Sequence, residues 1–270
     1  MTWLVATDST FFNAVKAINR ERDSATQPNW TLDKLASNPD KARLVSLRLE
    51  KEGISAIPTK RLGGNMALVM KLPHNRVLRV ADATAEEKRS KDWGIWQPIR
   101  DLGTVGGCHV EVYPEATTLV DGLKSGEVSK HEAGRLITQA VAAFARKGQF
   151  LWDCKPENFC YVKTGSNTHA LFVLDAGAVV PLSMMHEGKI GKDSHTNLDK
   201  FAGMMAQVMD DLGQPSGDVR SHPESYLTKL LNGVPLESVD NEGIQRAYTA
   251  SLGLNYQKRL SGMATGARER

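Results

Sequence analysis

The sequence has few cysteines, little net charge and no long hydrophobic run. Cys108, Cys154 and Cys160 are an odd number without C-x-x-C spacing, so we expect neither a disulfide framework nor a zinc knuckle. The 34 Lys and Arg against 31 Asp and Glu give a net charge of +3. That excess is too small to indicate a nucleic-acid partner, because phosphate binding needs clustered basic side chains. The apolar run Ala170–Leu174 is far shorter than a membrane span.

Signals for export and for several common catalytic sites are also missing. The segment Met1–Ala6 lacks the basic start and the apolar length of a signal peptide. The seven histidines show no H-x-x-x-H spacing, and G-x-S-x-G does not occur, which argues against a zinc site and a serine-hydrolase elbow. We therefore expect a soluble, cytoplasmic protein with no membrane partner, of ordinary globular composition. The sequence leaves its oligomeric state open.

The hydrophobic pattern changes twice along the chain. Residues 1–55 are polar with apolar side chains at helical spacing, and predict an N-terminal helical extension. Residues 56–116 carry short apolar runs, among which Leu68–Leu72 and Val77–Ala81 flank a turn and predict a hairpin. Residues 117–270 are mostly helical in pattern.

Several further elements are predicted from the same patterns. We expect a charged helix over residues 85–100, a strand at Val110–Tyr113, a long helix around Leu136–Ala145 that ends at Gly148, strands at Phe159–Val162 and Leu171–Leu174, and a helix over Leu198–Leu212. A sheet-rich half followed by a helical half predicts an α+β fold of two lobes with a cleft between them.

Two motifs carry most of the functional information. The first is Asp153-Cys-Lys155-Pro-Glu-Asn158, and the second is Asp175-Ala-Gly, 22 residues after Asp153. They resemble the catalytic loop and the metal-binding D-F-G motif of the protein-kinase-like superfamily, with Ala in place of Phe. A D-x-K-P-x-N window is expected by chance only about 0.002 times in a chain of this length, at roughly 5% per residue type.

The resemblance assigns a role to each of these side chains. Asp153 and Lys155 are the catalytic candidates: Asp153 would accept or orient the proton of the attacking hydroxyl, and Lys155 would place a cation near the transferred phosphate. Asn158 and Asp175 would supply oxygen ligands to Mg²⁺. A single Asp is more often a turn carboxylate, but the pairing of the two motifs at this spacing favours the functional interpretation.

The residues before residue 116 would hold ATP. Gly63 and Gly64 lie in a segment that resembles a glycine-rich loop one residue short and without its third glycine, although a plain hairpin turn explains two glycines equally well. Arg79 stands where the family has its ATP-binding lysine. Either Arg79 or Lys71 would contact the phosphates, or Arg79 is a solvent-facing strand residue.

That cation needs an acidic partner, which the resemblance places on the following helix. Glu86 is the first candidate, and Glu87 and Asp92 are the alternatives. Glu86 and Glu87 are equally compatible with first-turn residues that the helix dipole favours.

Other positions depart from the family pattern. Trp152 stands where many kinases have the Arg that binds an activating phosphate, and only about twenty residues, without an A-P-E motif, separate Asp175 from the next helix. Both features predict a shortened activation segment and activity that does not wait for phosphorylation. Asp199 either braces the catalytic loop or caps its own helix.

The resemblance covers roughly residues 57–212 and implies a two-lobed protein-kinase-like fold, with a small antiparallel-sheet N-lobe and a mostly helical, reduced C-lobe. It implies an ATP- and Mg²⁺-dependent Ser/Thr kinase similar to bacterial effector and phage-encoded kinases, which would phosphorylate a host protein in the host cytoplasm. The alternatives are a pseudokinase-like binding module, a small-molecule kinase and an AMP transferase on the same fold.

Overall fold

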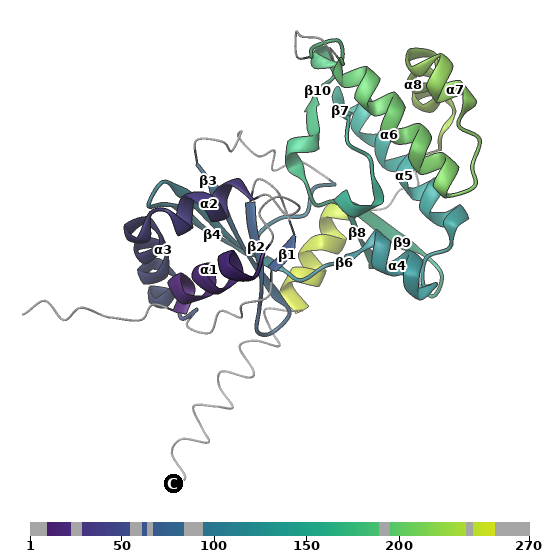
Figure 1. Ribbon diagram of the computed structural model, residues 1–270. Coiled ribbons are helices and arrows are strands. Elements are labelled where there is room, and N and C mark those ends of the chain that lie inside the picture. Colours follow the sequence, from purple (N-terminus) through teal and green to yellow (C-terminus); the bar gives the residue numbers. More distant parts are fainter. Residues whose placement is uncertain are drawn as a thin grey trace, which may run out of the picture. The chain divides into compact units, whose positions relative to one another are not determined.

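Figure 1 shows the computed structural model of the chain. It describes residues 10–22, 29–54, 61–63, 67–83, 94–188, 195–235 and 240–251. The fold is mixed α+β, with a small antiparallel sheet and helices, which confirms this part of the predicted fold class. The chain divides into two compact units, Met1–Lys88 with Gln97–Glu115 and Thr249–Arg270, and Arg89–Trp96 with Ala116–Tyr248. The predicted boundaries at residues 56 and 117 stay a prediction.

The first unit contains a five-stranded antiparallel sheet in the order β1-β2-β3-β5-β4. Its strands are β1 (Arg61–Gly63), β2 (Ala67–Leu72), β3 (Arg76–Asp82), β4 (Arg100–Val105) and β5 (Cys108–Pro114). The predicted hairpin is confirmed as β2 and β3. Its turn places His74 and Asn75 at positive φ, a conformation in which both residue types are enriched.

Three helices, α1 (Thr10–Glu21), α2 (Trp30–Ala36) and α3 (Pro39–Lys51), pack on this sheet (Figure 1). Side chains alternate between the faces of a strand, so one face of β2, β3 and β5 supplies a single set of apolar residues to the helices. The helices and the sheet share one hydrophobic cluster, which includes Phe11, Val15, Leu32, Leu35, Val45, Leu49, Leu68, Met70, Leu72, Leu78, Val80, Val110 and Val112. The helical segment therefore contributes to the core of the sheet unit.

The second unit is built from short strands and helices. It contains β6 (Thr117–Thr118), α4 (Leu119–Ser125), α5 (Lys130–Arg146), β7 (Gln149–Leu151), β8 (Phe159–Lys163), β9 (His169–Val173), β10 (Val179–Pro181), α6 (Asn197–Asp211), α7 (Gly217–Ser221) and α8 (Pro223–Gly233). Three 3-10 turns, η1 (Pro156–Asn158), η2 (Ala176–Ala178) and η3 (Leu182–Met184), lie between them, and residues 241–251 are helical. The strands pair in the orders β6-β8-β9 and β10-β7, all antiparallel.

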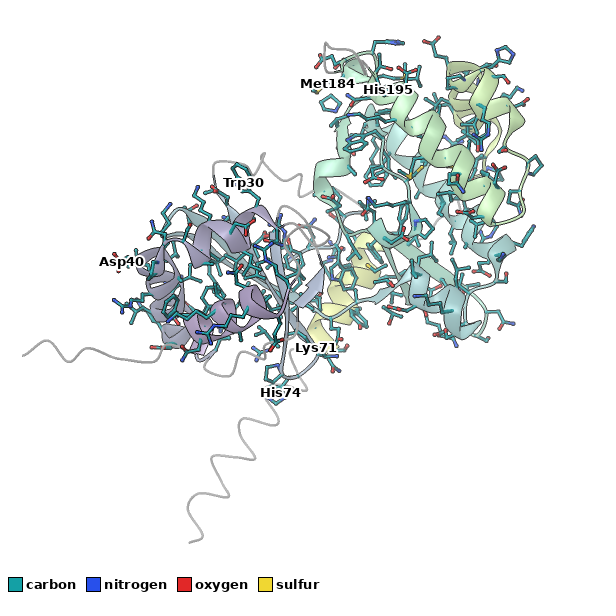
Figure 2. The ribbon with its side chains drawn as sticks, in the orientation of Figure 1. Trp30, Asp40, Lys71, His74, Met184 and His195 are labelled. Carbon is teal, nitrogen blue, oxygen red and sulfur yellow. The ribbon has the colours of Figure 1, made fainter. Side chains whose placement is uncertain are left out.

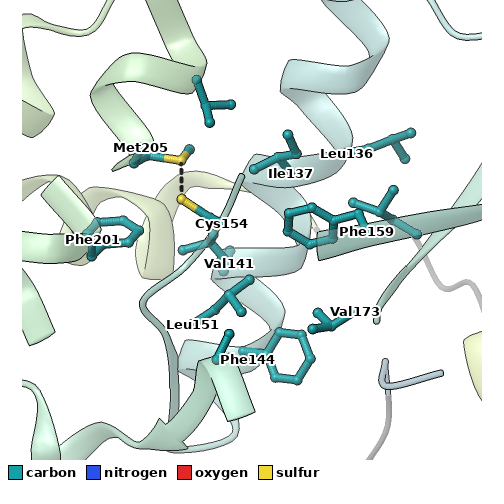
Figure 3. Close-up of a cluster of buried hydrophobic side chains, with 14 of the residues drawn as sticks. Leu136, Ile137, Val141, Phe144, Leu151, Cys154, Phe159, Val173, Phe201 and Met205 are labelled. Carbon is teal, nitrogen blue, oxygen red and sulfur yellow. Dashed lines mark hydrogen bonds between the residues drawn. The ribbon is translucent and has the colours of Figure 1, made fainter. Parts of the chain in front are cut away.

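The core of this unit lies between α5, α6 and the strands that follow α5 (Figure 3). Phe144, Phe159 and Phe201 are fully buried in it. The Cys154 thiol also lies in this core, with its Sγ 3.5 Å from Sδ of Met205. The loop after β7 is thus fixed to the hydrophobic core by a buried side chain in its middle.

The strands predicted at Val110–Tyr113, Phe159–Val162 and Leu171–Leu174 are confirmed, as are the helices around Leu136–Ala145 and Leu198–Leu212. The predicted helix over 85–100 is wrong in its last part, while residues 84–93 lie outside the described residues. Ile95 instead forms a bridge with Val173, and the Trp96 N–H donates to the Val173 carbonyl over 2.9 Å. No helix in the described part of the chain is long and apolar enough to cross a membrane.

A buried asparagine joins α2 to the sheet and gives a test of this packing. Asn29 Oδ1 accepts from the Leu32 N–H over 2.7 Å as the helix N-cap, and Asn29 Nδ2 donates to the Ala67 carbonyl over 2.9 Å. We expect Asn29→Ala to lower the free energy of unfolding by about 2–4 kcal/mol, from about 1 for the cap and about 1–3 for the buried hydrogen bond. Urea unfolding measures this change.

The matched control is Asn38→Ala at the exposed N-cap of α3, where Asn38 Oδ1 accepts from the Lys41 N–H over 3.3 Å. This variant should lose about 1 kcal/mol. Equal losses in the two variants would contradict a role for Asn29 in joining α2 to the sheet.

Candidate active site

The loop from β7 to β8 carries the first motif and is held by backbone hydrogen bonds. The Trp152 N–H donates to the Ala178 carbonyl over 3.1 Å at its start. Pro156 opens the 3-10 turn η1, where its fixed φ is favourable, and the Asn158 N–H closes that turn on the Lys155 carbonyl over 3.0 Å. Because Cys154 is buried in the core, the backbone fixes where its neighbours Asp153 and Lys155 lie.

Asp153 is buried, with 7% of its surface exposed. One carboxylate oxygen, Oδ2, accepts from Lys155 Nζ over 2.8 Å. The other, Oδ1, is buried and has no hydrogen-bond partner among the residues that the structure describes. A buried carboxylate oxygen without a partner is costly, so Oδ1 has an unused capacity to accept a hydrogen bond.

Asn158 is also buried, and its amide is oriented by the same loop. Nδ2 donates to the backbone carbonyl of Asp153 over 3.1 Å. Because an amide has one donor group and one acceptor oxygen, this bond leaves Oδ1 as the side chain's acceptor.

Pairing of β8 with β9 brings the second motif to this loop. Phe159 lies opposite Val173, and one position further on the Leu174 N–H donates to the Asn158 carbonyl over 2.7 Å. Asp175 follows directly and is exposed. Its Oδ1 accepts from the Gly177 N–H over 3.1 Å and so caps the 3-10 turn η2. The structure therefore gathers Asp153, Lys155, Asn158 and Asp175 at one end of the β8–β9 pair.

The donor set at this end of the strand pair includes amide and carboxylate oxygens. Mg²⁺ is bound by oxygen ligands, commonly one or two carboxylates together with substrate phosphates and water. Asn158 Oδ1 and the Asp175 carboxylate could supply two such ligands, because the hydrogen bonds around them leave oxygen atoms to bind a cation. Within the described ranges, no group of three or more His, Cys, Asp or Glu side chains could hold a metal ion, so a cation here would take its other ligands from a nucleotide and water.

The two cation candidates of the first unit have different surroundings. Arg79 on β3 is largely buried, with 16% of its side chain exposed, and its Nη1 lies 3.2 Å from Glu111 Oε2 on β5. The interpretation of Arg79 as a solvent-facing residue is therefore wrong. Lys71 on β2 is exposed and pairs with Glu115; Figure 2 shows it near the turn residue His74.

The remaining nucleotide candidates are only partly described. Gly63 ends β1, where the pairing with β2 is irregular and Gly63 lies opposite Val69. Gly64 and Glu86, with the alternatives Glu87 and Asp92, lie outside the described residues, so their roles stay predictions.

Sequence reasoning missed Glu111. Glu111 lies in a strand that was predicted. Its contact with Arg79, however, depends on the pairing of β3 with β5, because Glu111 and Arg79 are 32 positions apart in the sequence. The alternation of His109, Glu111 and Tyr113 along the strand was the one available signal, because it places three polar side chains on one face.

Two further predictions concern α6 and the segment before it. Asp199 forms a capping box with Thr196, whose N–H and hydroxyl both donate to Asp199 Oδ2. These hydrogen bonds hold the pKa of Asp199 below its usual value. Asp199 therefore caps its own helix, which confirms the second of the two alternatives. Trp152 lies under Lys200 of α6, with Nζ 5.1 Å from the ring centroid.

Comparison with protein-family models found no match, and a search among curated proteins found no similar sequence.

Cys154, next to Asp153, gives a test of which side chain is reactive. Burial raises the pKa of the Cys154 thiol, with the neighbouring Asp153 charge acting in the same direction, and burial also raises the pKa values of Cys108 and Cys160. A raised pKa keeps a thiol protonated near neutral pH, and only the thiolate is a strong nucleophile. We expect all three thiols to be inert to a thiol reagent at pH 8 in the native protein and to react after unfolding in urea. A thiol that reacts rapidly in the folded protein would contradict this.

Proposed function

We propose that the protein is an ATP- and Mg²⁺-dependent Ser/Thr protein kinase of minimal, two-lobed architecture. The observation that carries the proposal is that the segments with Asp153, Lys155, Asn158 and Asp175 lie at one end of the β8–β9 pair, where a buried carboxylate oxygen of Asp153 has no partner among the described residues. Phosphoryl transfer uses these residue types in these roles.

In the proposed reaction, Asp153 Oδ1 receives the hydrogen bond of a serine or threonine hydroxyl. The hydroxyl oxygen attacks the γ-phosphorus of ATP, the bond from that phosphorus to the β–γ bridging oxygen breaks, and ADP leaves. The hydroxyl proton passes to the Asp153 carboxylate. Lys155, which pairs with Asp153 Oδ2, fixes the orientation of the carboxylate and places a positive charge beside the transferred group.

Asn158 and Asp175 would hold Mg²⁺ through their side-chain oxygens. When bound, the ion neutralises negative charge on the phosphate oxygens. The hydrogen bond from Asn158 Nδ2 to the Asp153 carbonyl fixes the amide, and the cap on the Gly177 N–H fixes the Asp175 carboxylate. Both ligands are thus oriented before a nucleotide binds, which reduces the free-energy cost of ordering them.

The sheet of the first unit supplies the nucleotide lobe in this proposal. Support comes from the position of Arg79 on the third strand, where the family has its phosphate-binding lysine. The protein substrate would be a host protein, and the proposed setting is the host cytoplasm, as for the effector and phage kinases that the motifs resemble.

The segment after Asp175 favours activity without an activating phosphorylation. It pairs directly with the strand before the catalytic loop, with Val179 opposite Leu151 and Pro181 opposite Gln149. Further on, the Leu182 N–H donates to the Gly148 carbonyl over 2.8 Å. Backbone hydrogen bonds hold this segment in place without the Arg–phosphate contact that orders the segment in regulated kinases.

The first test replaces the proposed proton acceptor. Asp153→Asn keeps the size of the side chain and its ability to accept from Lys155, but removes the basic carboxylate. We expect transfer of the γ-phosphoryl group to protein to fall by about 10²–10⁴-fold, the usual contribution of general-base catalysis. Incorporation of label from γ-labelled ATP into protein measures the rate.

The matched control is Glu157→Gln, an exposed carboxylate of the same loop, which should transfer label at the wild-type rate. Equal transfer by Asp153→Asn and wild type would contradict the proposal. Incorporation from α-labelled ATP would instead indicate AMP transfer, label found only on a metabolite would indicate a small-molecule kinase, and ATP binding without any transfer would indicate a pseudokinase.

The second test concerns the metal ligands. Asp175→Asn retains the cap on the Gly177 N–H, because the amide oxygen also accepts, but removes the charge that favours a divalent cation. We expect the affinity for ATP in the presence of Mg²⁺ to fall about tenfold or more, which corresponds to about 1.4 kcal/mol, with little change when EDTA removes the metal. Calorimetric titration under both conditions measures the difference, and an equal loss in both would contradict a metal role for Asp175.

A further inference from the structure

The sheet of the first unit has two chemically different faces. One face of β2, β3 and β5 is apolar and packs on α1, α2 and α3. Strand pairing places Val69, Arg79 and Glu111 in one row of the opposite face, and Lys71, Val77 and Tyr113 in the neighbouring row. Both cation candidates therefore lie on the face that the helices do not cover.

Arg79 belongs to a buried polar group on that face. Arg79 Nη1 donates to Glu111 Oε2 over 3.2 Å, and the Tyr113 hydroxyl donates to the same oxygen over 3.0 Å. Glu111 is 4% exposed, and His109 Nε2 lies 3.6 Å from its other oxygen. A carboxylate is rarely buried to this extent unless it is paired, so Glu111 and Arg79 depend on each other.

The second candidate pair is different in kind. Lys71 and Glu115 are both partly exposed, with 46% and 29% of their side chains accessible. An exposed ion pair of flexible side chains is weak and does little to fix the position of its cation. The structure thus provides one oriented cation and one loosely held cation on the same face.

An oriented guanidinium suits the binding of phosphate. It carries five N–H donors in a planar fork, so it can contact a carboxylate and a phosphate together. A carboxylate that fixes the plane of the fork reduces the side-chain entropy lost when the phosphate binds. The buried carboxylate that does this for Arg79 is on the neighbouring strand.

We infer that Arg79, rather than Lys71, contacts the phosphates of the nucleotide, and that Glu111 is the positioning residue that orients it, held in turn by Tyr113. This inference rests on the proposed function. It assigns to a strand residue the part for which the motif resemblance suggested Glu86. Glu111 itself does not touch the nucleotide.

The test compares the binding of ATP and adenosine to the full chain. Glu111→Gln removes the charge that orients Arg79, and we expect the dissociation constant of Mg²⁺-ATP to rise about tenfold while that of adenosine stays unchanged. Tyr113→Phe keeps the carboxylate and removes one hydrogen bond, so the rise for ATP should be smaller, about two- to fivefold. A loosened fold would weaken the binding of both ligands. The ratio of the dissociation constants for Mg²⁺-ATP and adenosine therefore separates an effect on positioning from an effect on stability.

The matched control is Glu115→Gln, which alters the exposed pair on the same face and should leave ATP affinity within about twofold of wild type. Three results would overturn the inference: wild-type ATP affinity in Glu111→Gln, a parallel loss of affinity for ATP and adenosine, or a larger loss of ATP affinity in Glu115→Gln than in Glu111→Gln. This inference fails alone if Glu111→Gln binds ATP normally while the wild-type protein shows phosphate transfer that depends on Asp153. If the wild-type protein binds no ATP, the proposed function fails with it.

Discussion

The candidate site depends on the antiparallel pairing of β8 with β9. This pairing carries two motifs that are 22 residues apart to one end of a strand pair, where the Leu174 N–H donates to the Asn158 carbonyl. Hydrogen bonds between backbone groups fix this position, so the functional side chains do not have to hold one another in place. Asp175 can therefore be exposed while Asn158 next to it is buried.

The hydrophobic core supports the same arrangement from the other side. Cys154 is buried against Met205 between the two residues that line the site, and Phe159 is buried directly after Asn158. Functional and core side chains alternate within a few residues, so a shift of the loop by one position would expose the core and bury the charged groups. We infer that packing, more than electrostatic attraction, determines where Asp153 lies.

The sequence predicted the elements of this site better than it predicted those of the sheet unit. The Asp153 and Asp175 motifs are local patterns with fixed spacing, and the two apolar strand patterns between them predicted the pair β8 and β9 that the structure shows. β4 was missed because Gly103 interrupts a short, largely polar strand, and residues 94–100 were expected to be helical. Glu111 could not be assigned to Arg79 because their contact is set by strand pairing, which a single sequence does not specify.

The central claim is that Asn158 and Asp175 bind the metal of a nucleotide complex beside Asp153. A crystal structure of the protein with Mn²⁺ and a non-hydrolysable ATP analogue tests it most directly, because the anomalous scattering of Mn²⁺ locates the ion independently of the protein. The account predicts one anomalous peak within coordination distance of Asn158 Oδ1 and an Asp175 carboxylate oxygen, with the γ-phosphate near Asp153. A nucleotide bound with its metal away from these two residues would contradict it.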